Sequence, residues 1–195
     1  MKSIAHALLA LLAMTCAHAG PVNAPASIYN LQVSLTDQAG VAHDLDLYRG
    51  HPVLITMFYG SCSMTCPLLI DTLRAVDRSV PAQQRKDLRV LMITIDPEHD
   101  TPQALQTLAQ ERRIDTSRWT LANTDEKSVR KLAALLDIQY RPLPNGGYNH
   151  SSIVTLLSQD GEILVRSSVL GKADAALIAG LQQTSPILTG NRHPD

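Results

Sequence analysis

The sequence predicts an α/β sandwich with a mixed central sheet flanked by helices. Two continuous apolar runs, at residues 52–60 and 88–96, are typical of strands that are covered on both faces. Segments with helical spacing of apolar residues alternate with the strands, and residues 151–169 read as an antiparallel hairpin. Because the chain has 195 residues and is 45% hydrophobic, we expect one domain built around one core.

The first half of the chain predicts an N-terminal β-hairpin and then a strand, a loop and a helix. Residues 28–50 alternate apolar and polar side chains around the turn sequence TDQAG, which indicates the hairpin. The buried strand at 52–60 leads into GSCSMTCP, which carries two thiols. Residues 66–80 then place leucines at helical spacing, and Pro67 is tolerated in the first turn of the helix.

The second half predicts strands that alternate with capped helices. After the strand at 88–96, Thr101 is the expected N-cap of a helix, and Pro102 takes its first position. The final hairpin is expected to turn at Asp160 and Gly161. The other expected elements are a short strand WTLAN, a capped helix at 124–138 and a closing helix at 171–183.

The N-terminus predicts export. It carries one Lys, an apolar run from Ile4 to Met14 and the sequence AHA before Gly20, which is the pattern of a cleavable secretory signal. The run is shorter than the roughly 20 residues that cross a bilayer, so cleavage is favoured over a retained anchor. We expect a signal at 1–19, a linker at 20–27, one domain at 28–185 and a flexible tail at 186–195.

Removal of Cys16 with the signal would leave two cysteines, Cys62 and Cys66, in an oxidising compartment. A disulfide that closes so short a loop removes little entropy from the unfolded chain, so a purely structural bridge is disfavoured. The spacing exceeds the C-x-x-C of dithiol exchange proteins by one residue and suits two thiolates that share a metal. Because Cys66 lies near a helix N-terminus, we expect a lowered pKa for its thiol.

A thiolate pair needs a further ligand, and His150 is the candidate. It follows PLPNGGYN and precedes the apolar strand SSIVTLL, so it lies where a loop enters the sheet at the edge that the thiol loop reaches. Two sulfurs and one imidazole suit copper, whereas zinc usually requires a fourth ligand. Met64 could add a thioether, although packing against the loop is the more common role. Solvated or capping roles are expected for His43, His51, His99 and His193.

Three motifs occur in order: GSCSMTCP, TIDPEHDTPQAL and YNHSSIVTLLSQDGEI. Together they resemble the Sco/SenC family of copper-binding, thioredoxin-like proteins that assist cytochrome c oxidase assembly. The resemblance runs from about Tyr29 to Gln183 and implies a thioredoxin-like sandwich. It also implies that the copper ligands are Cys62, Cys66 and His150, with copper bound as Cu(I), Cu(II) or both.

The chain departs from the family immediately before the metal histidine. Many members carry Asp there, whereas this chain has Asn149, and the missing carboxylate is expected to weaken or retune the site. The middle motif is expected to cap the helix that follows it. It matches the family at Asp96, Pro97, Asp100, Thr101 and Pro102.

The resemblance implies a periplasmic or otherwise exported copper chaperone that delivers copper to the copper A site of cytochrome c oxidase. The alternative is a thiol-disulfide reductase that uses Cys62 and Cys66 as a redox-active pair to keep target cysteines reduced for metal insertion. The two interpretations differ in whether the protein is an enzyme, and we favour the metallochaperone, which is not one. A third class, a copper or redox sensor, would need a metal-dependent exposed surface that the sequence does not show.

The expected partners follow from the same resemblance. They are a copper-receiving oxidase subunit or another copper chaperone, together with a thiol reductant. The 17 basic and 18 acidic residues give a net charge of -1, so neither nucleic acid nor an anionic membrane surface is an expected partner. Membrane association is expected only through partners, unless the signal is retained.

Overall fold

The structure is a computed structural model that describes residues 27–62 and 64–184. The predicted signal at 1–19, the tail at 186–195 and all of the predicted linker except Ser27 lie outside the described residues. None of the described helices is both long enough and apolar enough to cross a bilayer.

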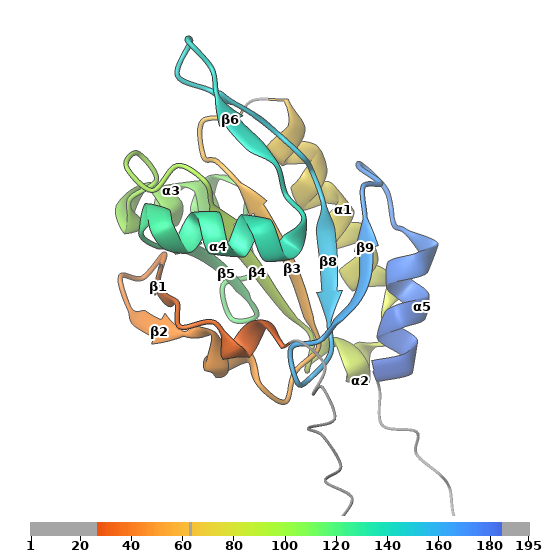
Figure 1. Cartoon of the computed structure of the whole chain (residues 1–195). Coiled ribbons are helices and arrows are strands. Elements are labelled where there is room, and N and C mark those ends of the chain that lie inside the picture. The colour runs from red at the N-terminus through yellow and green to blue at the C-terminus, as the bar shows by residue number, and fades with distance from the viewer. Residues whose placement is uncertain (1–26, 63, 185–195) are drawn as a thin grey trace, which may run out of the picture.

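A seven-stranded mixed sheet forms the centre of the molecule, in the order β2-β1-β5-β4-β3-β8-β9 (Figure 1). Its strands are β1 (Ser34–Asp37), β2 (Ala42–Asp44), β3 (Val53–Phe58), β4 (Arg89–Thr94), β5 (Trp119–Asn123), β8 (Val154–Leu157) and β9 (Ile163–Ser167). A separate two-stranded sheet consists of β6 (Tyr140–Pro142) and β7 (Tyr148–His150). The helices are α1 (Thr65–Ser79), α2 (Ala82–Arg85), α3 (Pro102–Glu111), α4 (Glu126–Leu136) and α5 (Ala175–Thr184), with 3-10 turns η1 (Ile28–Asn30) and η2 (Leu45–Tyr48).

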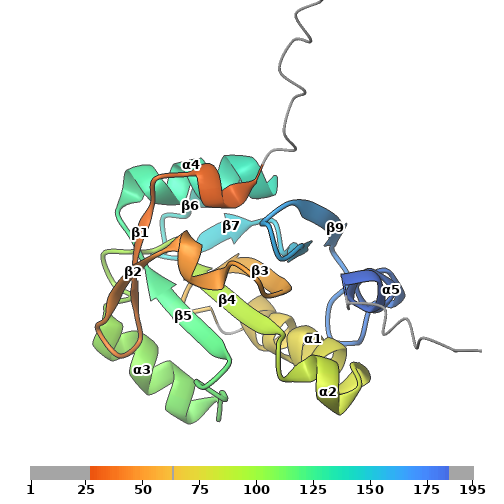
Figure 2. The same ribbon diagram turned by 90° about the horizontal axis from the view of Figure 1, so that it is seen from below.

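Helices cover both faces of the sheet, which confirms the predicted fold class. Successive side chains of a strand point to opposite faces, so Leu54 and Phe58 of β3 pack in one core and Ile55 and Met57 pack in another. Helices α1, α3 and α5 close the first core, and α4 with the two 3-10 turns closes the second (Figure 2). Each fully buried side chain of this size contributes about 1.5–3 kcal/mol to folding.

The register of β3 and β8 determines where the candidate site lies. The two strands are antiparallel, and Thr56 near the end of β3 pairs with Val154 at the start of β8. The loop that leaves β3 and the segment that enters β8 therefore meet at one edge of the sheet (Figure 1). This arrangement confirms the expectation that the segment carrying His150 reaches the edge where the thiol loop lies.

Most expected elements are present, and the largest difference is the β6–β7 hairpin. The N-terminal hairpin, the turn at Asp160 and Gly161 and the strand WTLAN are confirmed, and the Thr101 hydroxyl caps α3 by accepting the Ala104 N–H. The stretch PLPNGGYN reads as a flexible loop, yet its two ends lie in β6 and β7. His150 therefore belongs to a strand and not to a loop.

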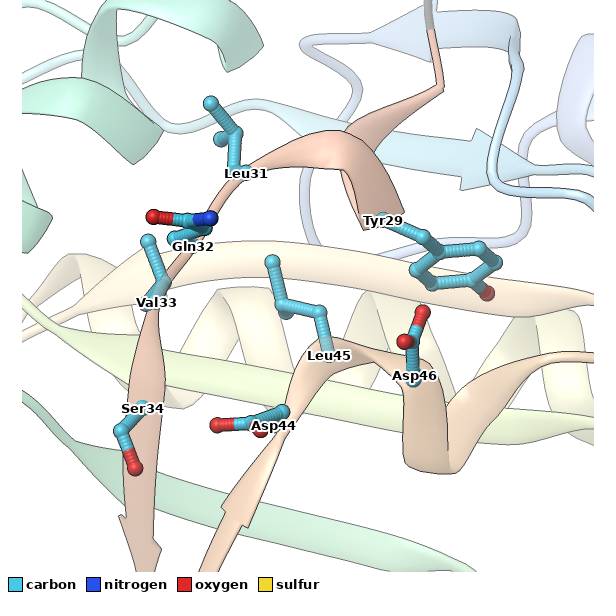
Figure 3. A pocket seen from close by; sticks show the side chains of 8 residues that line it. All are labelled: Tyr29, Leu31, Gln32, Val33, Ser34, Asp44, Leu45 and Asp46. Carbon is cyan, nitrogen blue, oxygen red and sulfur yellow. The ribbon is translucent and has the colours of Figure 1, made fainter.

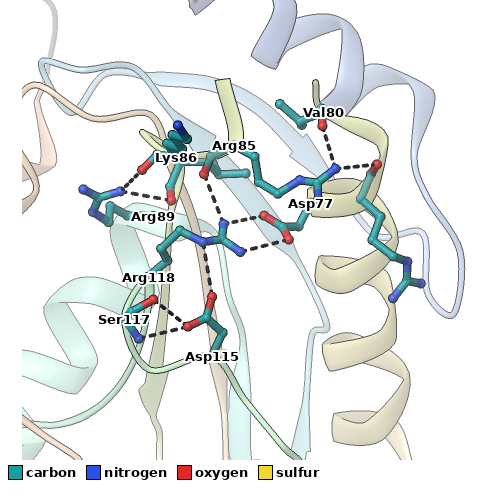
Figure 4. Close-up of polar contacts among 10 residues, drawn as sticks. Asp77, Val80, Arg85, Lys86, Arg89, Asp115, Ser117 and Arg118 are labelled. Carbon is teal, nitrogen blue, oxygen red and sulfur yellow. Dashed lines mark hydrogen bonds and ion pairs between the residues drawn. The ribbon is translucent and has the colours of Figure 1, made fainter. Parts of the chain in front are cut away.

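An ion pair between Asp77 and Arg118 fixes the C-terminal half of α1 against the sheet. The Arg118 guanidinium donates to both carboxylate oxygens of Asp77, at 2.7 and 3.2 Å, and its Nε lies 3.3 Å from a carboxylate oxygen of Asp115 (Figure 4). Asp77 lies in α1, and Arg118 immediately precedes β5. Because both charged groups are mostly buried, loss of either one would leave the other without its partner. The pair thus anchors the helix whose first turn carries Cys66.

Candidate metal centre

Cys62 lies in the loop between β3 and α1. Its backbone N–H donates to the Tyr59 carbonyl at 3.2 Å, and its sulfur accepts the backbone N–H of Cys66 at 3.4 Å. The side chain is buried, and the two cysteines are unbridged thiols. Because Cys62 precedes the helix, its side chain can approach that of Cys66 more closely than two residues four apart within a helix can. The loop is therefore compatible with a dithiol, a disulfide or a shared metal.

The pKa of Cys62 is lowered. Burial opposes ionisation of this thiol, but hydrogen bonds from the backbone and the thiol of Cys66 outweigh that cost. The backbone N–H groups of Thr65 and Met64 add to the effect, because the first turn of a helix offers unpaired donors. The helix N-terminus therefore favours thiolate at Cys62.

The expectation that Cys66 has a lowered pKa is wrong. Burial raises the pKa of this thiol, and the neighbouring Cys62 raises it further. Its Sγ lies 3.4 Å from the Tyr59 carbonyl oxygen, to which it donates. Cys66 is part of the core on the α1 side of the sheet, and loss of hydration there exceeds the attraction of the helix N-terminus. The pair thus combines one thiol with a lowered pKa and one with a raised pKa.

His150 presents an unpartnered nitrogen. Its Nδ1 lies 3.0 Å from the Ser151 carbonyl, so this nitrogen carries the proton and donates it. The Nε2 atom is buried and has no hydrogen-bond partner among the described residues. Burial lowers the pKa of the imidazole, and the bond to Ser151 offsets this only in part. His150 is therefore neutral at pH 7 and keeps the Nε2 lone pair that a metal requires.

The three predicted site residues come together. Donor atoms of Cys62, Cys66 and His150 all lie within 4.8 Å of one another, and they form the one such group of three that residues 27–62 and 64–184 contain. A cleft of about 600 Å³ separates the thiol loop from the β6–β7 hairpin and opens on this cluster. A metal bound to the three side chains would satisfy the unpartnered Nε2, so the donors present fit a soft cation.

Tyr59 connects the two halves of the cluster. Its carbonyl accepts hydrogen bonds from the Cys62 amide and the Cys66 thiol, and its ring packs edge-on against His150 with 5.6 Å between centroids. The Tyr59 ring also packs against the Tyr148 ring, with 5.3 Å between their centroids. The sequence analysis does not predict a role for Tyr59. The sequence feature that indicates one is the position of Tyr59 directly after a buried strand and before the thiols.

The middle motif does more than cap a helix. The carboxylate of Asp100 is buried, and it accepts the Gly60 backbone N–H at 2.8 Å and the Thr94 hydroxyl. Burial raises the pKa of Asp100, while these two hydrogen bonds act in the opposite direction. A Cβ on Gly60 would collide with the same carboxylate, so glycine is required there. Asp100 therefore fixes the start of the thiol loop.

Asp96 provides the matching contact to the hairpin. Its Oδ1 accepts a hydrogen bond from the Tyr148 hydroxyl at 3.3 Å and lies 2.8 Å from His99 Nδ1. Tyr148 lies two residues before His150 on β7. The segment from Asp96 to Asp100 therefore holds the thiol loop at one end and the histidine strand at the other.

The remaining candidates lie apart from the cluster or at its margin. Asn149 is exposed on β7, pairs with Arg141 across the hairpin and lines the cleft. Met64 is 79% exposed, so it does not pack against the loop as expected. The ring of His43 packs against Tyr48, His51 contacts Arg89, His99 pairs with Asp96, and His193 lies outside the described residues.

A second hollow, of about 370 Å³, lies between η1 and the segment from β2 to η2 (Figure 3). Tyr29, Asp44 and Asp46 contribute polar atoms to it, and its lining includes neither Cys nor His. This hollow therefore offers no soft-metal ligands, in contrast to the cleft beside Cys62 and His150.

Comparison with known proteins agrees with this geometry. The family model described as SCO1/SenC matches residues 23–184. A protein of Stutzerimonas stutzeri, named as a predicted copper-binding protein, is 27% identical over 165 residues, which cover 82% of this chain and 76% of that protein. The human mitochondrial SCO1 homolog is 29% identical over 137 residues, 67% of this chain and 44% of the human protein.

Solved structures share the fold. Copper-bound ScoI of Bradyrhizobium japonicum superimposes with a TM-score of 0.64 at 21% identity, covering 78% of this chain and 97% of that chain. Copper-bound ScoI of Arabidopsis thaliana gives 0.66 at 18% identity, with coverage of 77% and 94%. At these identities the likeness establishes the architecture.

Proposed function

Because the chain belongs to the SCO1/SenC family, we propose that it is an exported copper chaperone that carries copper on Cys62, Cys66 and His150 and delivers it to the copper A site of cytochrome c oxidase. The observation that carries the proposal is the buried, unpartnered Nε2 of His150 beside two thiol sulfurs. The names of the S. stutzeri relative and of the two copper-bound ScoI structures support the proposal, because they describe similar proteins that bind copper.

The donor set explains why copper is the cargo. Two thiolates and a neutral imidazole give a trigonal set of soft donors that suits Cu(I), and thiolate with imidazole can also hold Cu(II). Cys62 is the thiol that ionises more readily, so we infer that it captures the ion first. Cys66 then releases its proton to the solvent as its sulfur binds, and Nε2 of His150 completes the set. Binding therefore displaces protons, and affinity rises with pH.

Delivery requires that an acceptor reach the bound ion. The cleft beside Cys62 and His150 opens to solvent, so sulfur ligands of an acceptor can replace the three donors one at a time. The copper-receiving oxidase subunit or another copper chaperone is the proposed partner, and a thiol reductant must first supply the reduced cysteines.

The proposal of export rests on the signal-like N-terminus, and the position of Ser27 is compatible with it. Ser27 forms an isolated β-bridge with Glu162. Glu162 lies between β8 and β9, at the end of β8 that is farther from His150. The described chain therefore begins at the far end of the molecule from the cysteines (Figure 1). Whether residues 1–19 are cleaved or retained, the cleft would face away from the point where they join the domain.

The test is transfer of copper to a soluble copper A domain of an oxidase subunit. The Cu(I)-loaded protein and then its Cu(II)-loaded form are mixed with the reduced acceptor, and the copper A absorption bands and the copper content of the separated proteins are measured. We expect the acceptor to gain copper at the expense of this protein. Retention of all copper by the donor would exclude delivery.

The second candidate function is thiol-disulfide exchange. The observation that favours it is the asymmetric pair, in which Cys62 lines the cleft with a lowered pKa and Cys66 lies deeper with a raised one. This is the arrangement of an attacking thiolate and a resolving thiol. Reduction of an oxidised copper A domain by the His150→Ala variant at the wild-type rate would support this function, because the imidazole has no part in it.

A further inference from the structure

The sequence places three methionines in the described part of the chain, and they differ sharply in exposure. Met57 and Met92 are completely buried in the sheet, whereas 79% of Met64 is exposed. Exposure of a single apolar side chain is ordinary and carries no meaning by itself. The placement of Met64 is what distinguishes it, because it lines the cleft that Cys62 and His150 also line.

The local backbone places Met64 beside the metal cluster. Its backbone N–H contributes to the stabilisation of the Cys62 thiolate, and α1 begins at the next residue, Thr65. The main chain at Met64 is therefore directed toward the cluster, while the side chain remains in contact with solvent. The side chain is free to move between solvent and cleft, because Met has three rotatable bonds.

Met64 offers the one sulfur that solvent reaches freely in residues 27–62 and 64–184. Cys62 and Cys66 are 7% and 5% exposed, so an ion bound to them lies below the surface. A thioether is a neutral, soft donor that accepts Cu(I) but binds it more weakly than a thiolate does. A weak soft ligand at the mouth of a cleft is suited to passing an ion through and not to storing it.

We propose that Met64 is an exchange ligand, which binds Cu(I) at the mouth of the cleft while copper enters or leaves the Cys62, Cys66 and His150 cluster. The inference rests on the proposed carriage of copper and adds a residue for its transfer. During release, the bond from copper to His150 Nε2 breaks as a bond to Met64 Sδ forms. Both donors are neutral, so the charge of the centre is unchanged and copper stays Cu(I).

The remaining steps also balance. An acceptor thiolate binds the copper that Met64 has drawn outward, and the bonds to Cys62 and Cys66 then break. The two released sulfurs are thiolates, and Cys66 takes up a proton from water. No electron is transferred, so no oxidant or reductant is required. Loading from a donor follows the same exchanges in reverse.

A hydrophobic contact with the acceptor is the competing explanation for an exposed methionine. Leu68, one helical turn along α1, is 45% exposed and could belong to such a surface. The variant Met64→Leu distinguishes the two roles, because it keeps the apolar volume and removes the sulfur. The variant Met64→Ala removes both.

The kinetic experiment follows Cu(I) transfer from the loaded full-length protein to the chelator bicinchoninate by stopped flow. We expect Met64→Leu and Met64→Ala to be slowed equally, by roughly three- to tenfold, which corresponds to a barrier higher by about 0.7–1.4 kcal/mol. The equilibrium affinity is expected to stay within about twofold of the wild type, since the resting ligands are intact. Transfer by Met64→Leu at the wild-type rate would overturn the proposal, whatever the rate of Met64→Ala.

A direct measurement uses protein labelled with ¹³C in the methionine methyl groups and Ag(I) as a redox-inert substitute for Cu(I). We expect the Met64 methyl resonance, assigned by its loss in Met64→Leu, to shift when Ag(I) is added beyond the single equivalent that Cys62, Cys66 and His150 hold, while Met57 and Met92 serve as buried controls. If the wild type binds Cu(I) tightly but the Met64 resonance does not move, the exchange role is excluded and copper carriage stands. If the wild type binds no Cu(I), the proposed function itself fails.

Discussion

The carboxylate of Asp100 accepts a hydrogen bond from the backbone N–H of Gly60 at 2.8 Å, which joins the segment after β4 to the start of the thiol loop. Gly60 is the residue that permits this approach, because any Cβ would collide with the carboxylate. The geometry of the thiols thus depends on a side chain 40 residues further along the chain.

The Asp100→Ala variant tests this dependence. It leaves the Gly60 N–H and the buried Thr94 hydroxyl without their acceptor, so we expect a loss of about 1–3 kcal/mol in the free energy of unfolding. Urea denaturation of the reduced protein measures the loss. The control is Asp71→Ala, an exposed aspartate on α1 with only a 3.9 Å ion pair to Arg74. Equal stabilities of the two variants would show that the contact does not hold the loop.

The Tyr148→Phe variant tests the contact at the other end of the same segment. It keeps the ring that packs against Tyr59 and removes the hydroxyl that donates to Asp96. We expect a loss of about 0.5–1.5 kcal/mol in stability and faster amide exchange at His150. The control is Tyr140→Phe, whose hydroxyl makes no such bond to a carboxylate among the described residues. Unchanged exchange at His150 in Tyr148→Phe would refute the role of Asp96.

The two cysteines are predicted to differ in reactivity. Because the pKa of Cys62 is lowered and that of Cys66 is raised, iodoacetamide near neutral pH is expected to modify Cys62 at least about tenfold faster. Mass spectrometry of peptides from the briefly treated, reduced protein measures the ratio. In the unfolded protein the two rates should become similar. Preferential modification of Cys66 in the folded protein would reverse the assignment of the two thiols.

The two histidines near the site are predicted to act on stability with opposite signs. Burial lowers the pKa of His150 below 6.5, so the unfolded chain takes up this proton first and stability is lost as pH falls below that value. The hydrogen bond and charge of Asp96 raise the pKa of His99, so its contribution is present below 6.5 and is lost as pH rises through the raised value.

Denaturation of reduced wild type, His150→Gln and His99→Gln at about pH 7.5 and about pH 5 separates the two effects. Relative to the wild type, His150→Gln should lose less stability on acidification, and His99→Gln should lose more. Changes of the same sign in both variants would mean that the burial of His150 does not keep it neutral.

The sequence predicts this fold well wherever local pattern and tertiary packing agree. The apolar run that forms β3 and the cap at Thr101 are read directly, because strand burial and helix capping are local properties. The β6–β7 hairpin is missed, since its strands have three residues each and one includes Pro142. Its pairing depends on contacts with Tyr59 and Asp96 that no local pattern encodes.

The candidate site, like the fold, combines features that the sequence predicts with features that only the tertiary structure determines. The positions of Cys62, Cys66 and His150 follow from which strand ends meet at one edge of the sheet, and the sequence anticipates this. The pKa order of the thiols does not follow, because the helix N-terminus is a local feature and the burial of Cys66 is a tertiary one. The roles of Asp96 and Asp100 are likewise long-range contacts made by a loop that also caps α3.

Copper titration of the reduced protein tests the central claim most directly. Competition with a Cu(I) chelator is measured for the wild type, His150→Ala and the double variant Cys62→Ser/Cys66→Ser, with thermal unfolding as the check on folding. We predict that the wild type binds a single Cu(I), that His150→Ala binds it at least about tenfold more weakly while remaining folded, and that the double variant binds none tightly. Tight stoichiometric binding by the folded double variant would contradict the account.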